Sequence, residues 1–555
     1  MDVLQWIVPC PKKAALGSSH LDLGACRIHG DDATGTAVDA LTSSLALAEP
    51  STDAPDTRVE VRVEVRVDAA AGLPPEGYTL VAGDGRVAVV GADAAGAFYG
   101  AQTLLALAAV PCPEHARCVP ECEVRDWPDL PLRGTIEGFY GTPWSHAARL
   151  DHLRFSARHK LNAYVYAPKD DPFHRERWRE PYPPEELARL AELVAEAGRQ
   201  HVRLVFALSP GLSMVCSDPA ERAALRAKAE QVWEIGVREF ALLFDDIPPE
   251  LRHEADRAAY GTEEGASASA HAAVCRDFAT EFLARHGAER PLTMVPTDYA
   301  GTARGAYRDR LAAELPPGVL VWWTGPDIVV GTIPAYDMTA AAASYGHRLA
   351  LWDNFPVNDF DFSRVFLGPL VGRATDLGHA PLEGVTANPM VQATASRLAL
   401  TTVADYAWHL AAYDPGRSHR AAVRLLPGAA ELLPLVEACS AWPPGADQSP
   451  ALTALCASAL LGEGAGRLRA ELERLAGLPV DVPGAFAAEL ARWVAAARDM
   501  GAAGLAALDL LAGGEPGPAR RALERAEAHE ANVLRGVIPP FVRAALERAP
   551  GSAPA

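Results

Sequence analysis

Two adjacent carboxylates, Asp245 and Asp246, close the apolar run "EFALLFDDI" at residues 239–247. Pro248 and Pro249 follow directly, and they prevent a regular helix from continuing through the pair. Two neighbouring carboxylates do not ionise together easily, so the pair favours a state in which one carboxyl keeps its proton. The protonated member can donate to a leaving oxygen, while the ionised member can orient a substrate or act as a base.

Glycoside hydrolysis is the reaction class in which two acids commonly flank the bond that breaks. In retaining enzymes the two carboxyl groups are about 5 Å apart, and neighbours in sequence are too close for both to serve the same atom. We therefore expect the second acid to act on another part of the substrate. A 2-acetamido group fits, because its carbonyl can attack the anomeric carbon while an aspartate holds its N–H.

A divalent metal site is the competing interpretation of the same segment. "DDIPPE", residues 245–250, superficially matches an Asp-rich diphosphate-binding motif of the kind found in terpene synthases. That motif needs a helix to align its carboxylates, and the two prolines make a helix costly here. Since no second metal-binding motif follows, we predict no metal and no cofactor.

A regular alternation of buried strands and helices begins near residue 132. Continuous apolar runs joined by helical segments are typical of a parallel sheet covered by helices. Eight such units over roughly 280 residues predict a (β/α)8 TIM barrel. A doubly wound open sheet is the alternative, but it lacks the GxGxxG fingerprint after its first strand. The predicted strands are 133–141, 162–169, 202–210, 239–247, 291–299, 319–326, 348–356 and 382–390.

In such a barrel the catalytic residues lie at the carboxyl ends of the strands. Acids, amides, hydroxyls and tryptophans occupy these ends in this chain, which suits a carbohydrate: indole rings stack on sugars, and carboxylates and amides bind hydroxyls. A phosphate site would need Gly-rich loops and more cations than the single Lys169. One strand-end aspartate is often only a helix cap or a turn residue. The strand-end residues concerned are Glu137, Asp170, Asp171, Asp245, Asp246, Asp298, Trp323, Asp353, Asn354 and Asn388.

The flanking segments predict two further domains. Residues 1–127 form a small α/β domain, with a strand at 57–68, a hairpin at 78–91 and a helix at 94–108. The barrel occupies 128–415. Residues 416–555 are predicted to be an all-helical domain, because Ala/Leu/Glu/Arg amphipathic segments there alternate with Gly and Pro stops.

The bulk properties exclude several functions. A net charge of −20 over 555 residues argues against binding to nucleic acid or an anionic membrane. No apolar run reaches the roughly 20 residues that span a bilayer. The first residues, "MDVLQWIVPCPKK", have the wrong charge order for a secretory signal, so we expect a cytoplasmic protein.

Nine cysteines scattered over the chain do not indicate a disulfide framework. One cluster, "CPEHARCVPEC" at 112–122, has four zinc-ligand types in Cys112, His115, Cys118 and Cys122. Their spacing is tighter than in common zinc sites. A loop with unpaired thiols is therefore the favoured interpretation, with a metal left open.

Seven motifs in chain order resemble glycoside hydrolase family 84, the β-N-acetylglucosaminidases that include O-GlcNAcases and enzymes once called hyaluronidases. The resemblance covers residues 125–415 strongly. The motifs are "RGTIEGFYGTPWSH" (133–146), "YVYAPKDDP" (164–172), "LLFDDI" (242–247), "VPTDY" (295–299), "WTGP" (323–326), "WDNFPVND" (352–359) and "ANPM" (387–390).

The resemblance implies catalytic roles for the aspartate pair: Asp245 would orient the acetamido N–H and stabilise an oxazoline intermediate, and Asp246 would be the general acid and then the base. The family usually has Glu where this chain has Asp298. The implied sugar contacts are Gly138 and Lys169 at hydroxyls, Tyr299 at the acetamido and anomeric region, Thr324 and Trp352 lining the acetamido pocket, Asn354 at its carbonyl, and Asp359 and Asn388 at hydroxyls of the terminal ring.

The resulting hypothesis is a retaining exo-β-N-acetylglucosaminidase that uses substrate-assisted catalysis. Its substrate partner is a carbohydrate, with a glycoprotein as one candidate carrier. Two alternatives stay open: an endo-acting, hyaluronidase-type glycosidase and a glycan-binding protein without turnover. The sequence does not determine the natural aglycone or the oligomeric state.

Overall fold

Alternating valines shape the N-terminal sheet. In the computed structural model, which describes residues 3–45, 61–112 and 117–548, strand β3 (Val61–Val67) buries Val61, Val63 and Val65 on one face. The predicted hairpin is confirmed as β4 (Tyr78–Gly83) and β5 (Arg86–Gly91), and the predicted helix as α2 (Ala94–Ala108). Residues 57–60 of the predicted strand lie outside the described residues.

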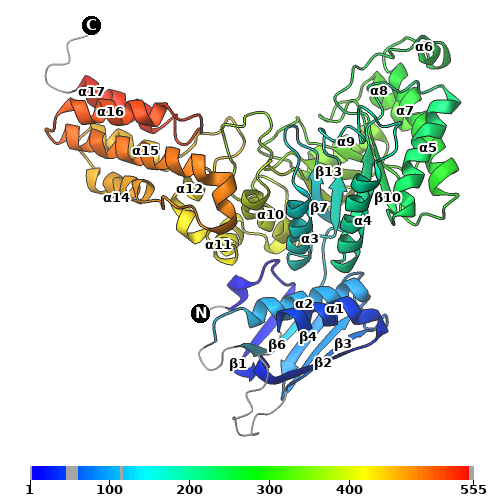
Figure 1. Ribbon diagram of the computed structural model, residues 1–555, viewed down its shortest axis with the longest axis horizontal. Helices are drawn as coiled ribbons and strands as arrows, with labels where there is room; N and C mark the ends of the chain where they lie inside the picture. The colour runs from blue at the N-terminus through cyan, green and yellow to red at the C-terminus, as the bar shows by residue number, and fades with distance from the viewer. Residues whose placement is uncertain (1–2, 46–60, 113–116, 549–555) are drawn as a thin grey trace. The chain divides into compact units, whose positions relative to one another are not determined.

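Three further strands complete this six-stranded sheet, and the sequence analysis did not predict them. They are β1 (Lys13–Asp22), β2 (Cys26–Gly30) and β6 (Cys118–Asp126), and the strand order is β1-β6-β4-β5-β3-β2. Helices α1 (Gly35–Ser44) and α2 lie side by side on one face of the sheet (Figure 1).

Eight parallel strands close into a barrel, which confirms the predicted fold. Each forms within one of the predicted apolar runs or starts one residue before it, and β14 closes the barrel by pairing with β7. Parts of the barrel and its helices are visible around β7, β10 and β13 in Figure 1. The strands are β7 (Leu132–Glu137), β8 (Ala163–Tyr166), β9 (Arg203–Leu208), β10 (Glu239–Leu243), β11 (Thr293–Val295), β12 (Leu320–Trp323), β13 (Leu349–Asp353) and β14 (Leu382–Ala387).

The barrel is filled by apolar side chains, including Val165, Ala207, Leu243 and the buried Trp322. The helices between the barrel strands are α3 (His146–Arg158), α4 (Pro184–Arg199), α5 (Pro219–Glu234), α6 (Glu254–Tyr260), α7 (Ala266–Asp277), α8 (Ala306–Glu314) and α9 (Ala335–Tyr345). Helix α10 (Ala393–Trp408) follows β14 in the chain.

The N-terminal sheet is joined to the amino-terminal side of the barrel by buried polar contacts. Arg133, at the start of β7, donates to the Glu76 carboxylate at 2.7 Å. Lys160, in the turn before β8, donates to Tyr78 at 2.8 Å and to Asp126 at 3.2 Å. These residues lie at the amino-terminal ends of the barrel strands, away from the carboxyl ends where catalytic residues are expected.

The described chain divides into two units: the sheet and barrel belong to the first, and the second comprises 356–371, 389–402 and 422–555. The described part of residues 416–555 is largely helical, as predicted, and the second unit also includes the non-helical segment 356–371. Its long helix α15 (Ala487–Leu511) packs on α14 (Ala465–Ala476), α16 (Pro516–Glu527) and α17 (Ile538–Glu547). Further helices are α11 (Pro415–Leu425), which crosses the boundary between the units, α12 (Leu433–Ala438) and α13 (Pro450–Leu460).

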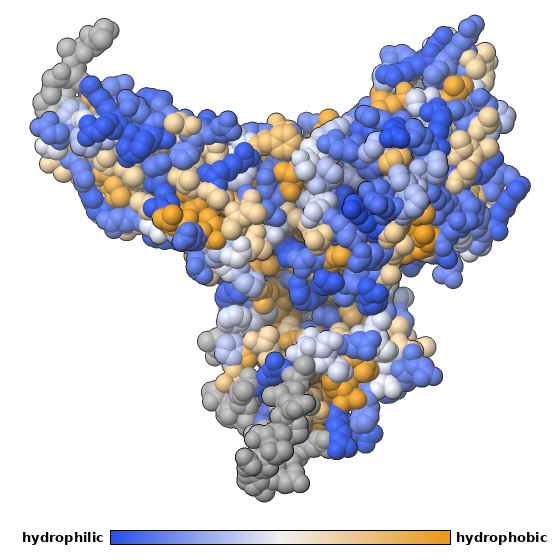
Figure 2. Space-filling view, in the orientation of Figure 1, coloured by the Kyte–Doolittle hydropathy of each residue, from blue (hydrophilic) through white to orange (hydrophobic). Residues whose placement is uncertain are grey.

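The exposed face in Figure 2 is largely hydrophilic over both units, with hydrophobic residues scattered across it. Among the described helices, none has both the length and the apolar character that crossing a bilayer requires.

Candidate active site

A break in strand alternation places both aspartates of the pair at the barrel mouth. Ala241 and Leu243 of β10 point into the barrel, so Asp245 continues on the same side. Phe244 points the other way and stacks on buried His271, with ring centres 4.2 Å apart. Continued alternation would send Asp246 outward, but its φ of +52° turns the chain. Aspartate tolerates this left-handed conformation better than most residues.

Asp245 is nearly buried, at 5% exposure, and only one of its oxygens is engaged. Its Oδ2 accepts a hydrogen bond from Lys169 Nζ at 2.5 Å. Its Oδ1 is buried and has no hydrogen-bond partner within the described part of the chain. Buried carboxylate oxygens are normally bonded, so this atom is an acceptor prepared for a donor supplied from outside the protein.

Asp246 is exposed, and each of its carboxylate oxygens accepts a hydrogen bond from one phenol. Tyr140, from the loop after β7, donates to Oδ2 at 2.7 Å. Tyr299, from the loop after β11, donates to Oδ1 at 2.9 Å. Burial raises the pKa of Tyr140 to about 12 and also raises the pKa of Tyr299, so both hydroxyls keep their protons at neutral pH. The two phenols therefore fix the orientation of the Asp246 carboxyl group.

Arg175, in the loop after β8, binds the Tyr140 side chain. Its Nη1 donates to the Tyr140 hydroxyl at 2.9 Å, and its guanidinium carbon lies 5.6 Å from the centre of the Tyr140 ring. The Tyr140 oxygen therefore accepts from a cation and directs its own proton to Asp246. Lys169 Nζ lies 5.7 Å from the same ring centre, so a second cation borders Tyr140.

A connected amide network forms the neighbouring wall. Asn354 Oδ1 accepts from Trp352 Nε1 and from Asn388 Nδ2, both at 2.9 Å. The backbone N–H of Gly138 donates to Asn388 Oδ1 at 3.3 Å. Gly138 must lack a side chain, because a Cβ there would lie 2.4 Å from Cζ2 of Trp352. The Asn354 amide nitrogen donates to the Ile328 carbonyl at 2.9 Å, which fixes the orientation of the side chain.

The two remaining predicted site residues differ in their positions. Thr324 follows β12, is 4% exposed, and donates its hydroxyl to the Asp327 carbonyl at 3.2 Å. Asp359 belongs to the second unit, so its contact with the sugar stays a prediction. The other predicted residues, from Gly138 to Asn388, all lie in the first unit at the carboxyl ends of barrel strands or just beyond them.

Several polar strand-end residues that were not assigned to the sugar are engaged by other side chains or by the backbone of the protein. Trp323 is fully buried and donates to the Gly301 carbonyl. The engaged acids are Glu137, bonded by Arg149 and Tyr164; Asp171, bonded by Tyr166 and Tyr182; Asp298, bonded by Arg308; and Asp353, bonded by Arg373.

Tyr140 and Arg175 are site residues to which the sequence analysis gave no role. Tyr140 lies inside one of the family-like motifs, at 133–146, so its position beside Gly138 was a usable signal. Arg175 lies in the charged segment "DDPFHRERWRE" (170–180), in which the sequence gives no reason to prefer one charged residue over another as a site residue. Only the folded chain distinguishes it from its neighbours.

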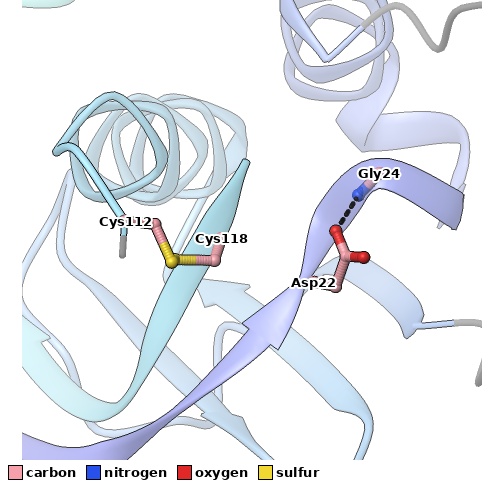
Figure 3. The surroundings of a disulfide bond; sticks show 4 residues. All are labelled: Asp22, Gly24, Cys112 and Cys118. Carbon is pink, nitrogen blue, oxygen red and sulfur yellow. Dashed lines mark hydrogen bonds between the residues drawn. A yellow bond between two sulfur atoms is a disulfide. The ribbon is translucent and has the colours of Figure 1, made fainter. Parts of the chain in front are cut away.

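The cysteine segment also differs from its interpretation as a loop with unpaired thiols. Cys112 and Cys118 form a disulfide, and Cys118 begins strand β6 (Figure 3). Cys122 is free and buried in the domain core. His115, the other predicted ligand, lies outside the described residues.

Comparison with known families gives two matches along the chain. Residues 133–437, more than half of the chain, match the family described as beta-N-acetylglucosaminidase. Residues 5–127 match domain 2 of glycosyl hydrolase family 20. Protein O-GlcNAcase of Rattus norvegicus and that of Mus musculus are each 37% identical over 281 residues, which are 50% of this chain and 30% of the relative. The match therefore spans less than a third of these relatives.

Two solved structures extend the comparison to the fold. The structure titled CpGH84B has a TM-score of 0.84 and 27% identity, and the match covers 97% of this chain and 99% of that one. A mutant of the O-GlcNAc hydrolase of Thermobaculum terrenum has a TM-score of 0.68 and 32% identity, with 75% of this chain and 94% of that one covered.

Proposed function

Because the chain belongs to the β-N-acetylglucosaminidase family, glycoside hydrolase family 84, we propose that it is a retaining exo-β-N-acetylglucosaminidase that uses the 2-acetamido group of its substrate as the nucleophile. The observation that carries the proposal is the unequal environment of the aspartate pair. Asp245 is buried, held by Lys169 on one oxygen, and open on the other. Asp246 is exposed at the mouth between two phenols.

In the first step the acetamido carbonyl oxygen attacks the anomeric carbon, and the bond to the leaving oxygen breaks. Asp246 gives its proton to that oxygen as the general acid. Asp245 Oδ1 accepts the acetamido N–H, which becomes more acidic as positive charge develops on the ring being formed. That hydrogen bond strengthens towards the transition state, so it lowers the barrier rather than only binding the substrate. The Lys169 ammonium keeps the buried Asp245 charge compensated throughout.

In the second step a water molecule attacks the anomeric carbon of the oxazoline intermediate, and the oxazoline ring opens. Asp246, now ionised, takes the proton of the water. The two phenol donors hold the carboxylate in place for this role, because both oxygens are already bonded to fixed groups. Two inversions at the same carbon give net retention of configuration.

Gly138, Trp352, Asn354 and Asn388 support a pocket for the sugar and its acetamido group. The indole and amides are locked to one another before a ligand arrives, which reduces the entropy lost on binding. Thr324 and Tyr299 complete the proposed contacts within the first unit. The curated relatives are named protein O-GlcNAcases, so a sugar O-linked to protein is the proposed natural substrate.

The direct test is hydrolysis of an aryl β-N-acetylglucosaminide, followed by nuclear magnetic resonance to determine the anomer released first. We expect the β-anomer, competitive inhibition by a thiazoline analogue of the intermediate, and no turnover of the matching aryl glucoside. Release of the α-anomer, or equal turnover of the glucoside, would exclude participation of the acetamido group. A glycoprotein with O-linked N-acetylglucosamine and an oligosaccharide of hyaluronan, assayed in parallel, separate exo from endo action by product length.

A further inference from the structure

Three metal-binding side chains converge in the N-terminal sheet, outside the barrel. His20, Cys112 and Cys118 each offer one ligand atom, and these atoms lie within 4.8 Å of one another. His20 is near the end of β1, Cys112 follows α2, and Cys118 begins β6. The pairing of β1 with β6 brings them together, since Asp22 lies opposite Cys118.

The histidine is the independent observation at this cluster. Its Nδ1 is buried and has no hydrogen-bond partner among the residues that the structure describes. Buried polar nitrogens nearly always have a partner, so an unbonded nitrogen on an imidazole ring that reaches within 4.8 Å of two sulfur atoms needs a reason. Coordination of a metal ion by imidazole and thiolates supplies one.

We propose that this cluster is a redox-gated site for a zinc-like divalent ion. With the disulfide formed, as in this structure, the sulfur atoms are unable to act as thiolate ligands. A dithiol reductant transfers two electrons and two protons to the disulfide, giving two thiols and becoming a disulfide itself. One Zn2+ then binds the two sulfurs and His20, and two thiol protons are released to solvent.

The chemistry and size of the cluster fit this ion. Zinc binds sulfur at about 2.3 Å and imidazole at about 2.0–2.1 Å, so tetrahedral ligands lie about 3.4–3.8 Å apart. Once the disulfide opens, the two sulfurs must separate to this distance, while the His20 nitrogen, already within 4.8 Å of both, moves closer to them. Two thiolates and a neutral imidazole also balance the charge of the ion, which matters because Cys118 is only 3% exposed.

The neighbouring thiol is excluded by its surroundings. Cys122, four residues along β6 from Cys118, is free and packs in the hydrophobic core of the sheet. Its sulfur is not among the ligand atoms that lie within 4.8 Å of one another. His29, on β2, is exposed and outside the cluster. Both residues provide matched controls.

The test is metal binding by the full chain before and after reduction with a dithiol. Co2+ titration monitors thiolate charge-transfer absorption, and equilibrium dialysis with Zn2+ gives the stoichiometry. We expect one ion per chain in the reduced protein and none in the oxidised protein. His20→Ala should weaken binding about tenfold or more, while His29→Ala and Cys122→Ser leave it unchanged.

Two results would overturn the proposal: no stoichiometric ion in the reduced protein, or unchanged binding in His20→Ala. Cys118→Ser should abolish the charge-transfer band, and circular dichroism will show whether that variant folds. If it does not fold, His20→Ala still decides, because it leaves both cysteines in place. None of these measurements depends on glycosidase activity, so the proposed function can fail without affecting this inference.

Discussion

The buried pair of Lys169 and Asp245 gives the sharpest energetic test of the site. Lys169→Met keeps most of the side-chain volume but removes the ammonium that bonds Asp245 Oδ2. The two side chains are only 2% and 8% exposed, so water has little access to the remaining carboxylate. Removing one member of a buried pair costs about 3–5 kcal/mol, because the other charge is left uncompensated. We expect a loss of unfolding free energy of that size at pH 7.

The double variant Lys169→Met with Asp245→Asn separates this charge effect from lost packing. Removing both charges leaves no uncompensated ion, so most of the lost stability should return, with a coupling of about 2–4 kcal/mol. Urea unfolding of the four proteins, followed by the fluorescence of the barrel tryptophans, measures this coupling. Turnover should fall about 100-fold or more in each single variant and little further in the double variant, because the two residues act as one unit.

Additive effects on stability would refute this reasoning. A coupling below about 0.5 kcal/mol is what residues without interaction show. It would mean that Asp245 does not depend on Lys169 for its charge, and that the short contact does not compensate the carboxylate. Asp246→Asn is the matched control for activity, since its side chain is exposed and should cost turnover with little loss of stability.

Three other perturbations follow from the structure. Gly138→Ala places a Cβ 2.4 Å from the Trp352 ring, so the affinity for the thiazoline inhibitor, measured by calorimetry, should fall about tenfold. Gly198→Ala is the control, because open space surrounds that position and the same affinity should stay unchanged. Arg175→Gln removes the cation that donates to the Tyr140 hydroxyl, so the phenol that bonds Asp246 loses its fixed position. We expect kcat to fall about tenfold with KM little changed, and an unchanged kcat would contradict this positioning role. Burial lowers the pKa of His271 to about 3, whereas a histidine in the unfolded chain has a pKa near 6.5, so the unfolded chain binds the proton first as the pH falls. The free energy of unfolding should therefore decrease by about 1.4 kcal/mol between pH 7.5 and pH 5.5. Urea unfolding should show that His271→Gln lacks this part of the decrease.

The barrel could be predicted from sequence because its strands are buried on both faces. The runs 202–210 and 239–247 each contain five consecutive apolar residues, and the helices between the strands are long enough to recognise. Strands β1 and β2 escaped prediction for the opposite reason. The segment "KAALGSSHLD" of β1 contains glycine, serines and a bulge in its pairing, so it lacks a period of two. Its strand character comes from pairing with β6, more than 90 residues away.

Asp245 and Asp246 could be singled out as the candidate pair because they are adjacent in the sequence. Residue type alone could not separate them from the strand-end acids that the protein itself engages. Asp353 and Asp298 look like site residues until Arg373 and Arg308 are known to bind them. The residues of the first ion pair are 20 positions apart in the sequence and those of the second are 10 apart. Neither separation is a spacing from which an ion pair could be predicted. Burial and partnership, rather than residue type, decide which strand-end carboxylate stays available to a ligand.

The left-handed residue at Asp246 explains how adjacent acids can perform different tasks. In a plain strand, neighbours face opposite sides, so one aspartate of the pair would leave the mouth. The turn at φ +52° returns it and costs of the order of 1–3 kcal/mol. Bonds to Tyr140 and Tyr299 offset that cost, and the Thr297 hydroxyl, which donates to the Phe244 carbonyl at 2.7 Å, holds the strand end in place. Asp245 thus stays deep beside Lys169 while Asp246 stands at the rim. In the proposed mechanism, the deep position serves the acetamido group of the sugar and the rim position serves its leaving oxygen, so one turn after one strand would supply both groups.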